Sequence, residues 1–384
     1  GLFAVLGKNA VVSHLKLTNA TINCDFVNAG VVAGVNYGKI NFVTVTNSIV
    51  ANSNDEATTT FIGGIAGKVV AKNVTEQEFT ARVQYSSVAN ARLQAKNSGS
   101  KIIGGIVGRV DGGMIYNTFA MADIIAVNGN QAILGGLVGS VANDHTNAGS
   151  RVAIVNNYAK VLGFDVRDVT SGKMGLLLGE NLNEGTDTTP ELKPLEENKW
   201  QNRILGNFVE KENLAEGATA TPTIGGVHDE DINSAYLALA VSAENLKVIP
   251  TNEQLEQLNT SGAINPDLAF VGYDSQGFYA IWDFTSVWNI EPSVNNGYAF
   301  IRDDAVTVSD IIYDEFGTRR VDNEAKLRQA FADDFADDGL YNGKYLITND
   351  ITLTGEWTPI GTSANPFNGK FVMGLDDEGN TVSI

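Results

Sequence analysis

The sequence predicts an all-β fold: a parallel β-helix solenoid of about seven coils, with a smaller C-terminal unit that contains a helix. Two repeated motifs and one nearly constant spacing support this prediction. An apolar pentad bounded by glycines recurs through the first half of the 384-residue chain, and a short polar-to-apolar tetrad follows each pentad. Such recurrence is the signature of a repeat architecture rather than of an isolated motif.

The pentads supply the glycines of the repeat. The clearest copy is Gly104–Gly108, with Ile106 and Val107 between the glycines, and related copies end at residues 7, 34, 67, 139 and 179. Glycine lets the backbone turn tightly and approach neighbouring chain closely, so we expect these residues to be scaffold and not part of a binding site. The glycines given this structural role are Gly34, Gly64, Gly67, Gly105, Gly108, Gly136, Gly139 and Gly179.

The tetrads divide each repeat into a constant arm and a variable arm. Between 21 and 26 residues separate the start of a tetrad from the last glycine of the next pentad, whereas 6 to 19 residues separate a pentad from its tetrad. Insertions on one arm only are typical of a solenoid with loops on one face. We therefore expect the long loops, 68–83 and 140–154, to share one edge with the short ones at 35–40 and 109–116.

The apolar runs within each repeat predict three strands per turn, for example 114–121, 124–127 and 133–141. Paired glycines inside the runs, and the absence of a sustained 3.6-residue stripe, argue against helices. Stacked parallel strands lie about 4.8 Å apart, so equivalent residues of successive turns should form columns. The first residues of the tetrads are then expected to form one hydrogen-bonded corner ladder of Ser13, Asn41, Ser86, Asn117 and Asn156.

Composition excludes some classes of partner. The net charge of −19 is uneven: residues 1–180 carry 14 Lys and Arg against 11 Asp and Glu, residues 181–302 carry 6 against 18, and residues 303–384 carry 6 against 16. No basic stripe is present, which argues against nucleic acid as a partner. Cys24 is the only cysteine, so no disulfide can form within the chain, and no apolar run reaches the ~18–20 residues of a membrane helix.

The second half of the chain departs from the repeat. Residues 180–201 read as a long exposed loop, 206–209 fit the tetrad, and a degenerate pentad at 224–229 predicts the end of the solenoid. Thr251–Leu258 reads as a capped helical turn. The run 282–288 alternates aromatic residues, which predicts a strand that plugs the open apolar end of the solenoid; Trp282 and Trp288 are its structural residues.

Residues 303–384 read as the start of a second module. A helix is expected over 322–338, with Leu327, Phe331 and Phe335 on one face and Gly339 after it. Strands should follow at 344–353, 356–361 and 366–371, with Trp357 in a structural role. The predicted domains are therefore 1–245 as the β-helix, 246–302 as its C-terminal cap, and 303–384 as the second module.

The repeated pentads resemble the GLUG motif of bacterial surface proteins. That family includes adhesins of Bacteroides-type gut bacteria, and the motif also occurs in N-terminal regions of immunoglobulin A1 proteases. The resemblance covers residues 1–179, and the segment 349–371 resembles the beginning of such a module. It implies an extracellular, cell-surface (outer membrane-associated) protein and an architectural role for the motif.

Residue patterns for catalysis or metal binding are sparse. His14, His145 and His228 occupy different repeat positions, and Cys24 reads as a small, buried apolar thiol. One candidate calcium site, with alternating oxygens at Asp229, Asp231 and Asn233, lacks the glycine and final Glu of a calcium loop. We expect no cofactor. An enzyme that acts on carbohydrates stays possible if four acidic residues converge on one groove. These are Asp111, Asp123, Asp165 and Asp168.

These patterns favour an extracellular structural or adhesive module, a rigid repeat rod that presents variable loops to a host or bacterial surface protein or a glycan. The alternative is a β-helix carbohydrate-active enzyme or its substrate-binding appendage. The chain begins inside a repeat and ends within the start of another module, so we expect it to be a piece of a longer tandem array. One hypothesis is that residues 339–384 of one copy dock head to tail against residues 1–20 of another, because both ends would otherwise expose apolar strands. The alternative is that both ends are frayed or covered by local loops.

Overall fold

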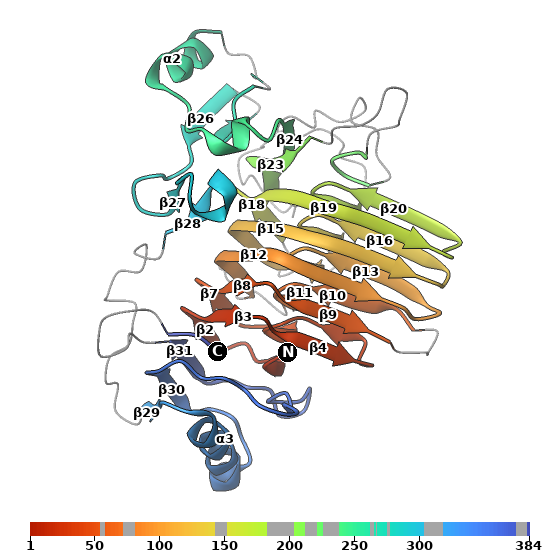
Figure 1. Cartoon of the computed structure of the whole chain (residues 1–384), viewed down its shortest axis with the longest axis vertical. Coiled ribbons are helices and arrows are strands. Elements are labelled where there is room, and N and C mark those ends of the chain that lie inside the picture. The colour runs from red at the N-terminus through yellow and green to blue at the C-terminus, as the bar shows by residue number, and fades with distance from the viewer. Residues whose placement is uncertain are drawn as a thin grey trace, which may run out of the picture.

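The computed structural model describes residues 1–53, 58–71, 81–142, 152–182, 203–211, 221–225, 238–261, 265, 267–274, 277–302, 318–373 and 382–384. These residues are mostly β-strand, as the sequence predicts, and most of the strands belong to three parallel sheets. Figure 1 shows the strands stacked one above another, with the C-terminal elements beside the N-terminal strands. Among the described residues, no helix has both the length and the apolar character needed to cross a membrane.

Two of the sheets meet at the pentads. The six-stranded sheet contains, in order, β1 (Phe3–Leu6), β6 (Ala33–Asn36), β11 (Ala66–Val70), β14 (Val107–Asp111), β17 (Val138–Ala142) and β21 (Leu178–Asn181). The five-stranded sheet contains β20 (Ser171–Gly175), β16 (Gln131–Gly135), β13 (Ser100–Gly104), β10 (Thr60–Gly63) and β5 (Asn28–Ala29). Each repeat thus adds one strand to each sheet.

The third sheet has sixteen strands. Its main path runs through β24 (Ala238–Val241), β23 (Asn207–Glu210), β19 (Tyr158–Arg167), β15 (Gly113–Val127), β12 (Arg82–Ala95), β7 (Lys39–Asn41), β2 (Val11–Ser13), β31 (Lys370–Met373), β30 (Lys344–Ile347) and β29 (Thr318–Val321). Shorter strands pair beside this path: β3 (Lys16–Thr18), β4 (Thr21–Cys24), β8 (Thr44–Thr46), β9 (Ile49–Asn52), β18 (Val152–Val155) and β22 (Arg203–Leu205).

The pentad is a bend and not the middle of a strand. The run predicted as one strand over 133–141 is two strands, β16 and β17, which are separated by Gly136 and Leu137. Conversely, the runs 114–121 and 124–127 belong to the single strand β15. The predicted strand boundaries were therefore wrong, because the glycine pair ends a strand and the intervening polar residue Asp123 does not.

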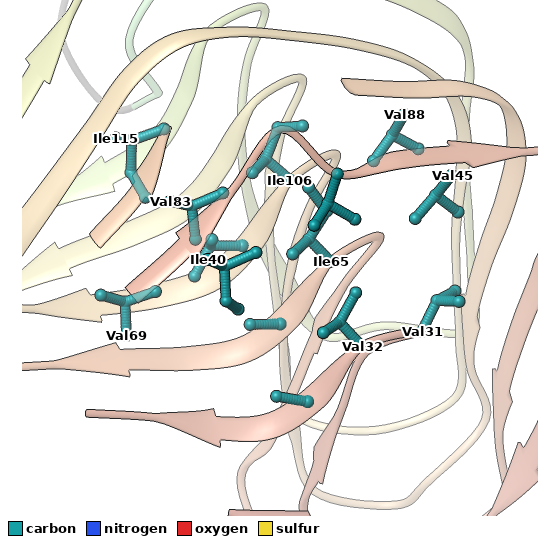
Figure 2. Close-up of a cluster of buried hydrophobic side chains, with 14 of the residues drawn as sticks. Val31, Val32, Ile40, Val45, Ile65, Val69, Val83, Val88, Ile106 and Ile115 are labelled. Atoms are coloured by element: carbon teal, nitrogen blue, oxygen red, sulfur yellow. The ribbon is translucent and has the colours of Figure 1, made fainter. Parts of the chain in front are cut away.

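Apolar side chains from the three sheets fill the space between them. Ile40, Val83 and Ile115 are fully buried and lie in register on β7, β12 and β15. Ile65 and Ile106, from two successive pentads, face this column across the interior (Figure 2). Because Ile40, Val83 and Ile115 are all β-branched, each packs on the matching residue of the next repeat.

Three columns of pentad glycines let the sheets pack backbone to backbone. A Cβ on Gly104 would lie closer than 3.0 Å to the carbonyl oxygen of Val107, across the bend itself. A Cβ on Gly105 would meet Ala120 of the sixteen-stranded sheet at 2.6 Å, and one on Gly108 would meet the backbone nitrogen of Ile62 in the five-stranded sheet at 2.6 Å. None of the pentad glycines has a positive φ, so they are needed for space and not for an unusual conformation.

The polar residues predicted to form one corner ladder do not all align with one another across the repeats. Ser13 aligns with Asn41, but Asn41 aligns with Gln84 and not with Ser86. A left-handed backbone position fixes the corner in every repeat, and the residues there are His14, Phe42, Tyr85, Asn117, Asn156 and Gly206. The five predicted residues thus do not form one column, because two aromatic residues and a histidine occupy the corner where the prediction placed small polar ones.

A buried polar ladder does exist one residue beyond this corner. Ser86 aligns with Thr118, and Asn157 and Asn207 continue the ladder; all four are nearly or fully buried. The Asn157 side chain accepts hydrogen bonds from the Thr118 amide (2.8 Å) and hydroxyl (2.9 Å) and donates to the carbonyl of Ile115 (3.1 Å). It also donates to the side-chain oxygen of Asn207 at 2.9 Å. These bonds satisfy backbone groups that the corner leaves unpaired.

The connections that vary in length share one edge. Each joins the six-stranded sheet to the sixteen-stranded sheet: β6 to β7, β11 to β12, β14 to β15, and β17 to β18. Because these strands are in-register neighbours within their sheets, the ends of all four connections lie along one edge, as predicted. The centres of the two long connections, 72–80 and 143–151, lie outside the described residues.

Residues 246–302 form a lobe on the side of the sixteen-stranded sheet. It contains the 3-10 helices η1 (Asn245–Lys247) and η2 (Asn295–Gly297), the helix α2 (Asn252–Ser261), and the strands β25 (Val271–Asp274), β26 (Gly277–Ile281), β27 (Trp288–Asn289) and β28 (Phe300–Ile301). The predicted cap of α2 is confirmed: the Thr251 amide donates to Gln254 Oε1 (2.8 Å), and the Gln254 amide donates to Thr251 Oγ1 (3.3 Å).

The prediction that Trp282 and Trp288 plug the end of the interior was wrong. Trp282 packs on Phe208, and Trp288 packs on Phe119 and Tyr158; these three aromatics point outward from β15, β19 and β23, and the cluster is separate from the interior core. Residues 282–287 also form a turn between β26 and β27, and only Trp288 belongs to a strand. The outward aromatics of the sheet provide the apolar surface that the two tryptophans cover.

The C-terminal residues return to the N-terminal strands of the same chain. Helix α3 (Glu324–Asp338) begins after the cap residue Asn323 and ends at Gly339, as predicted. Strand β31 pairs in parallel with β2, and Phe3 packs on Phe367 with ring centroids 4.8 Å apart. The expectation that both ends expose apolar strands was therefore wrong, because Phe3 is only 1% exposed. The predicted domain boundaries stay a prediction.

We predict that Gly105→Ala lowers the free energy of unfolding by at least ~2 kcal/mol, because the added methyl group overpacks the contact with β15. Gly172→Ala is the matched control, since its Cβ would meet only the Ala132 carbonyl oxygen, at 3.5 Å; we expect a change within ~1 kcal/mol. Urea denaturation measures both. Equal stability of the two variants would contradict the role of the pentad glycine.

We predict that Asn157→Ala costs about 1–3 kcal/mol, because it removes the side-chain partner of the buried Thr118 amide and hydroxyl and of the Ile115 carbonyl. Asn156→Gly, at the neighbouring corner position with a φ of 55°, should change stability by less than ~1 kcal/mol. Thermal denaturation of the two variants tests the ladder. A loss confined to the Asn156 variant would show that the corner residue, and not the ladder, holds the turn.

Candidate functional site

The structure describes only some of the histidines and predicted metal ligands. Asp229, Asp231 and Asn233, like His145 and His228, lie outside the described residues. Within the described ranges, no group of three or more His, Cys, Asp and Glu side chains is placed to hold a metal ion. The calcium site at 229–233 stays a prediction.

An aromatic stack runs along the left-handed corner. His14 stacks on Phe42 with ring centroids 4.9 Å apart, Phe42 stacks on Tyr85 at 4.8 Å, and Tyr116 meets Tyr85 edge-on at 5.7 Å. The Phe42 ring lies within 12° of parallel to both His14 and Tyr85, so these two rings cover its faces. A sugar needs an open ring face on which to stack, so this column is better suited to holding the corners in register than to binding a glycan.

The four acids named for the enzyme alternative do not gather in one place. Asp111 lies at the end of β14, where it pairs with Lys68 (3.0 Å) and Arg109 (2.6 Å). Asp123 and Asp165 lie on neighbouring strands, β15 and β19, two positions apart in register. Asp123 is exposed, and Asp165 is paired with Arg167 at 2.6 Å.

Asp168 lies apart from these pairs, at a bend after β19 with a φ of 55°. Of the four acids, only Asp123 and Asp165 lie on neighbouring strands, on the outward side of the sheet and two positions apart in register. A retaining or inverting glycosidase needs one carboxyl group kept protonated by an apolar site while the other stays charged. Asp123 is exposed, and Asp165 is partly exposed and paired with Arg167 at 2.6 Å, so neither lies in an apolar site.

One polar cluster joins the lobe to the sheet. Lys160 of β19 donates to the Tyr298 hydroxyl (2.6 Å) and pairs with Glu210 of β23 (3.0 Å), and the Tyr298 hydroxyl donates to Glu210 (2.6 Å). Burial raises the pKa of Tyr298. Burial also opposes the charge of Lys160, but its hydrogen bonds to Tyr298 and Glu210 outweigh this and raise its pKa. These three contacts fasten Tyr298 of the lobe to β19 and β23 of the sheet.

Lys101 is the most unusual charged residue of the interior. It is fully buried on β13, and its ammonium group donates to the carbonyl oxygens of Asn97 (2.6 Å), Gly99 (3.1 Å) and Asn128. Burial lowers the pKa of Lys101 to about 8. Three backbone carbonyls from two bends thus share one cation, which ties the bend after β12 to the bend after β15.

Sequence reasoning missed Lys101 and the cluster around Tyr298. Lys101 aligns with Thr60 and Ala132 in neighbouring repeats, so a repeat alignment would have shown a lysine at an inward position. Lys160, Glu210 and Tyr298 carry no comparable signal, because Tyr298 is brought to the sheet from more than eighty residues away in the chain.

Three comparisons of this chain, with protein-family models, with curated proteins and with solved structures, found no match. The inference of function therefore rests on the geometry above.

We predict that Lys101 makes stability depend on pH. Its pKa is about 8 in the folded protein and 10.5 when unperturbed, so the unfolded chain binds more protons between these values. The free energy of unfolding should then rise with pH across this window, by up to about 3 kcal/mol relative to Lys101→Met. Denaturant titrations of both proteins at several pH values measure the difference. A difference that stays constant with pH would contradict the lowered pKa.

Proposed function

We propose that this chain is an extracellular structural or adhesive module, in which a parallel β-helix of about seven coils presents variable loops along one edge. The three parallel sheets support the β-helix, since each repeat contributes one strand to the six-stranded and the five-stranded sheets and one to three strands to the sixteen-stranded sheet. The repeated glycine pentads support membership of the GLUG-type surface proteins, and with it a location at the cell surface of a Bacteroides-type bacterium.

The observation that carries the proposal is the placement of the long connections. Those between β11 and β12 and between β17 and β18 begin and end on the same edge as their short counterparts. A rigid scaffold with length variation confined to one edge is the arrangement by which repeat proteins bind surface proteins or glycans through loops. The pentad glycines contribute only to the scaffold.

The enzyme alternative has less support. Asp123 and Asp165 are its best candidates because they lie on adjacent strands, but one is exposed and the other is paired with Arg167. If the chain cleaves polysaccharides, Asp165→Asn should abolish the release of reducing ends from glycan substrates.

We predict that the intact chain binds a subset of probes on an array of glycans and host surface proteins. Replacing 72–80 or 143–151 with a short Gly-Ser link should remove that binding, because the loops would carry the contact surface. The matched control replaces 54–57, which connect the sixteen-stranded sheet to the five-stranded sheet at a different edge. Binding that survives both loop replacements, or that is lost only in the control, would refute the proposal.

A further inference from the structure

The C-terminal residues complete the sheet at its N-terminal end entirely through noncovalent contacts. The Val11 amide donates to the Gly369 carbonyl (3.0 Å), the Gly7 amide donates to Phe367 (2.6 Å), and the Ile384 amide donates to Lys16 (2.9 Å). Trp357 Nε1 also donates to the Leu2 carbonyl at 3.1 Å. These backbone bonds continue the parallel ladder from β2 to β31 without a break.

Side chains from both ends form one buried aromatic core. Phe3 lies 4.8 Å from Phe367 and 5.6 Å from Phe371 between ring centroids, and Phe331 of α3 packs edge-on to Phe3 at 6.4 Å. Phe3, Phe367 and Phe371 are each no more than 1% exposed. Without the C-terminal residues, Phe3 and the edge of β2 would therefore be uncovered.

We propose that residues 318–384 can be exchanged between copies, so that they complete the N-terminal end of a second chain. In an exchanged pair, all of these hydrogen bonds and aromatic contacts are reproduced, because the two chains are identical. The exchanged state differs from the closed monomer in which chain supplies them. The monomer is favoured at low concentration, since the chain itself holds the C-terminal residues at a high effective concentration near their own N-terminal end.

The form of exchange decides what assembles. Reciprocal exchange between two chains gives a closed dimer, whereas one-way exchange gives an open head-to-tail series. Both require the β2–β31 ladder to open and the aromatic core to separate, so exchange should be slow in the native protein and should occur readily when chains refold together. This replaces the simpler expectation that the two ends are free and dock directly.

The test uses two cysteine variants of the full chain, each in a Cys24→Ser background. Val11→Cys and Lys370→Cys change residues that are aligned partners on β2 and β31, and both side chains are partly exposed. The two variants are unfolded, mixed, refolded together at high concentration and oxidised. Only exchange brings a cysteine of one chain beside a cysteine of the other in a folded protein.

A disulfide-linked heterodimer is expected, at least about tenfold more abundant than with a control pair of Val11→Cys and Glu291→Cys. Glu291 is exposed and follows β27, which belongs to a separate two-stranded sheet and not to the β2–β31 ladder. A chain that carries both Val11→Cys and Lys370→Cys should close an internal disulfide when refolded dilute, which verifies that both variants fold. Heterodimer no more abundant than in the control pair, together with that internal closure, would overturn the proposal.

Discussion

The close approach of backbones at the glycine pentads is the constraint on which the other features depend. At each bend the six-stranded and five-stranded sheets lie too near one another to admit a Cβ, as Gly108 shows against Ile62. This fixes where each repeat turns, and it therefore fixes the register of the strands on both sides. The interior is left narrow, so small and β-branched residues fill it, and the pentads provide Ile65 and Ile106 at equivalent positions.

A shared register keeps each column of side chains on one side of the sheet, inward or outward, from one repeat to the next. The inward position after the corner changes from Leu15 and Val43 to Ser86, Thr118 and the two asparagines that follow. The outward position beside it changes from Lys16 and Thr44 to Phe119 and Tyr158. The apolar outward residues occur where the lobe covers the sheet, so the lobe and the sheet surface depend on each other.

The N-terminal end of the stack is covered by residues from late in the chain. Strands β31, β30 and β29 extend the sixteen-stranded sheet beyond β2, and Phe331 of α3 stacks on Phe371 of β31. Parallel sheets need such covering, because an open edge invites pairing with other chains. The same complementarity that covers the edge within one chain is what makes exchange between two chains possible.

The sequence alone determined the periodic features. It predicted parallel strands, the glycine scaffold, the shared edge of the variable connections, the capped helix at Thr251 and the helix that ends before Gly339, because each depends on local residue choice or on spacing between repeats. Only the tertiary structure decided the register at the corner, the position of the Trp282–Trp288 lobe on the side of the sheet, the burial of Lys101 and the return of residues 318–384 to the N-terminal strands. These features depend on contacts between residues far apart in the chain. In a strand, a register shift of one residue exchanges the inward and outward side chains. The local sequence therefore does not predict which partner a buried surface contacts.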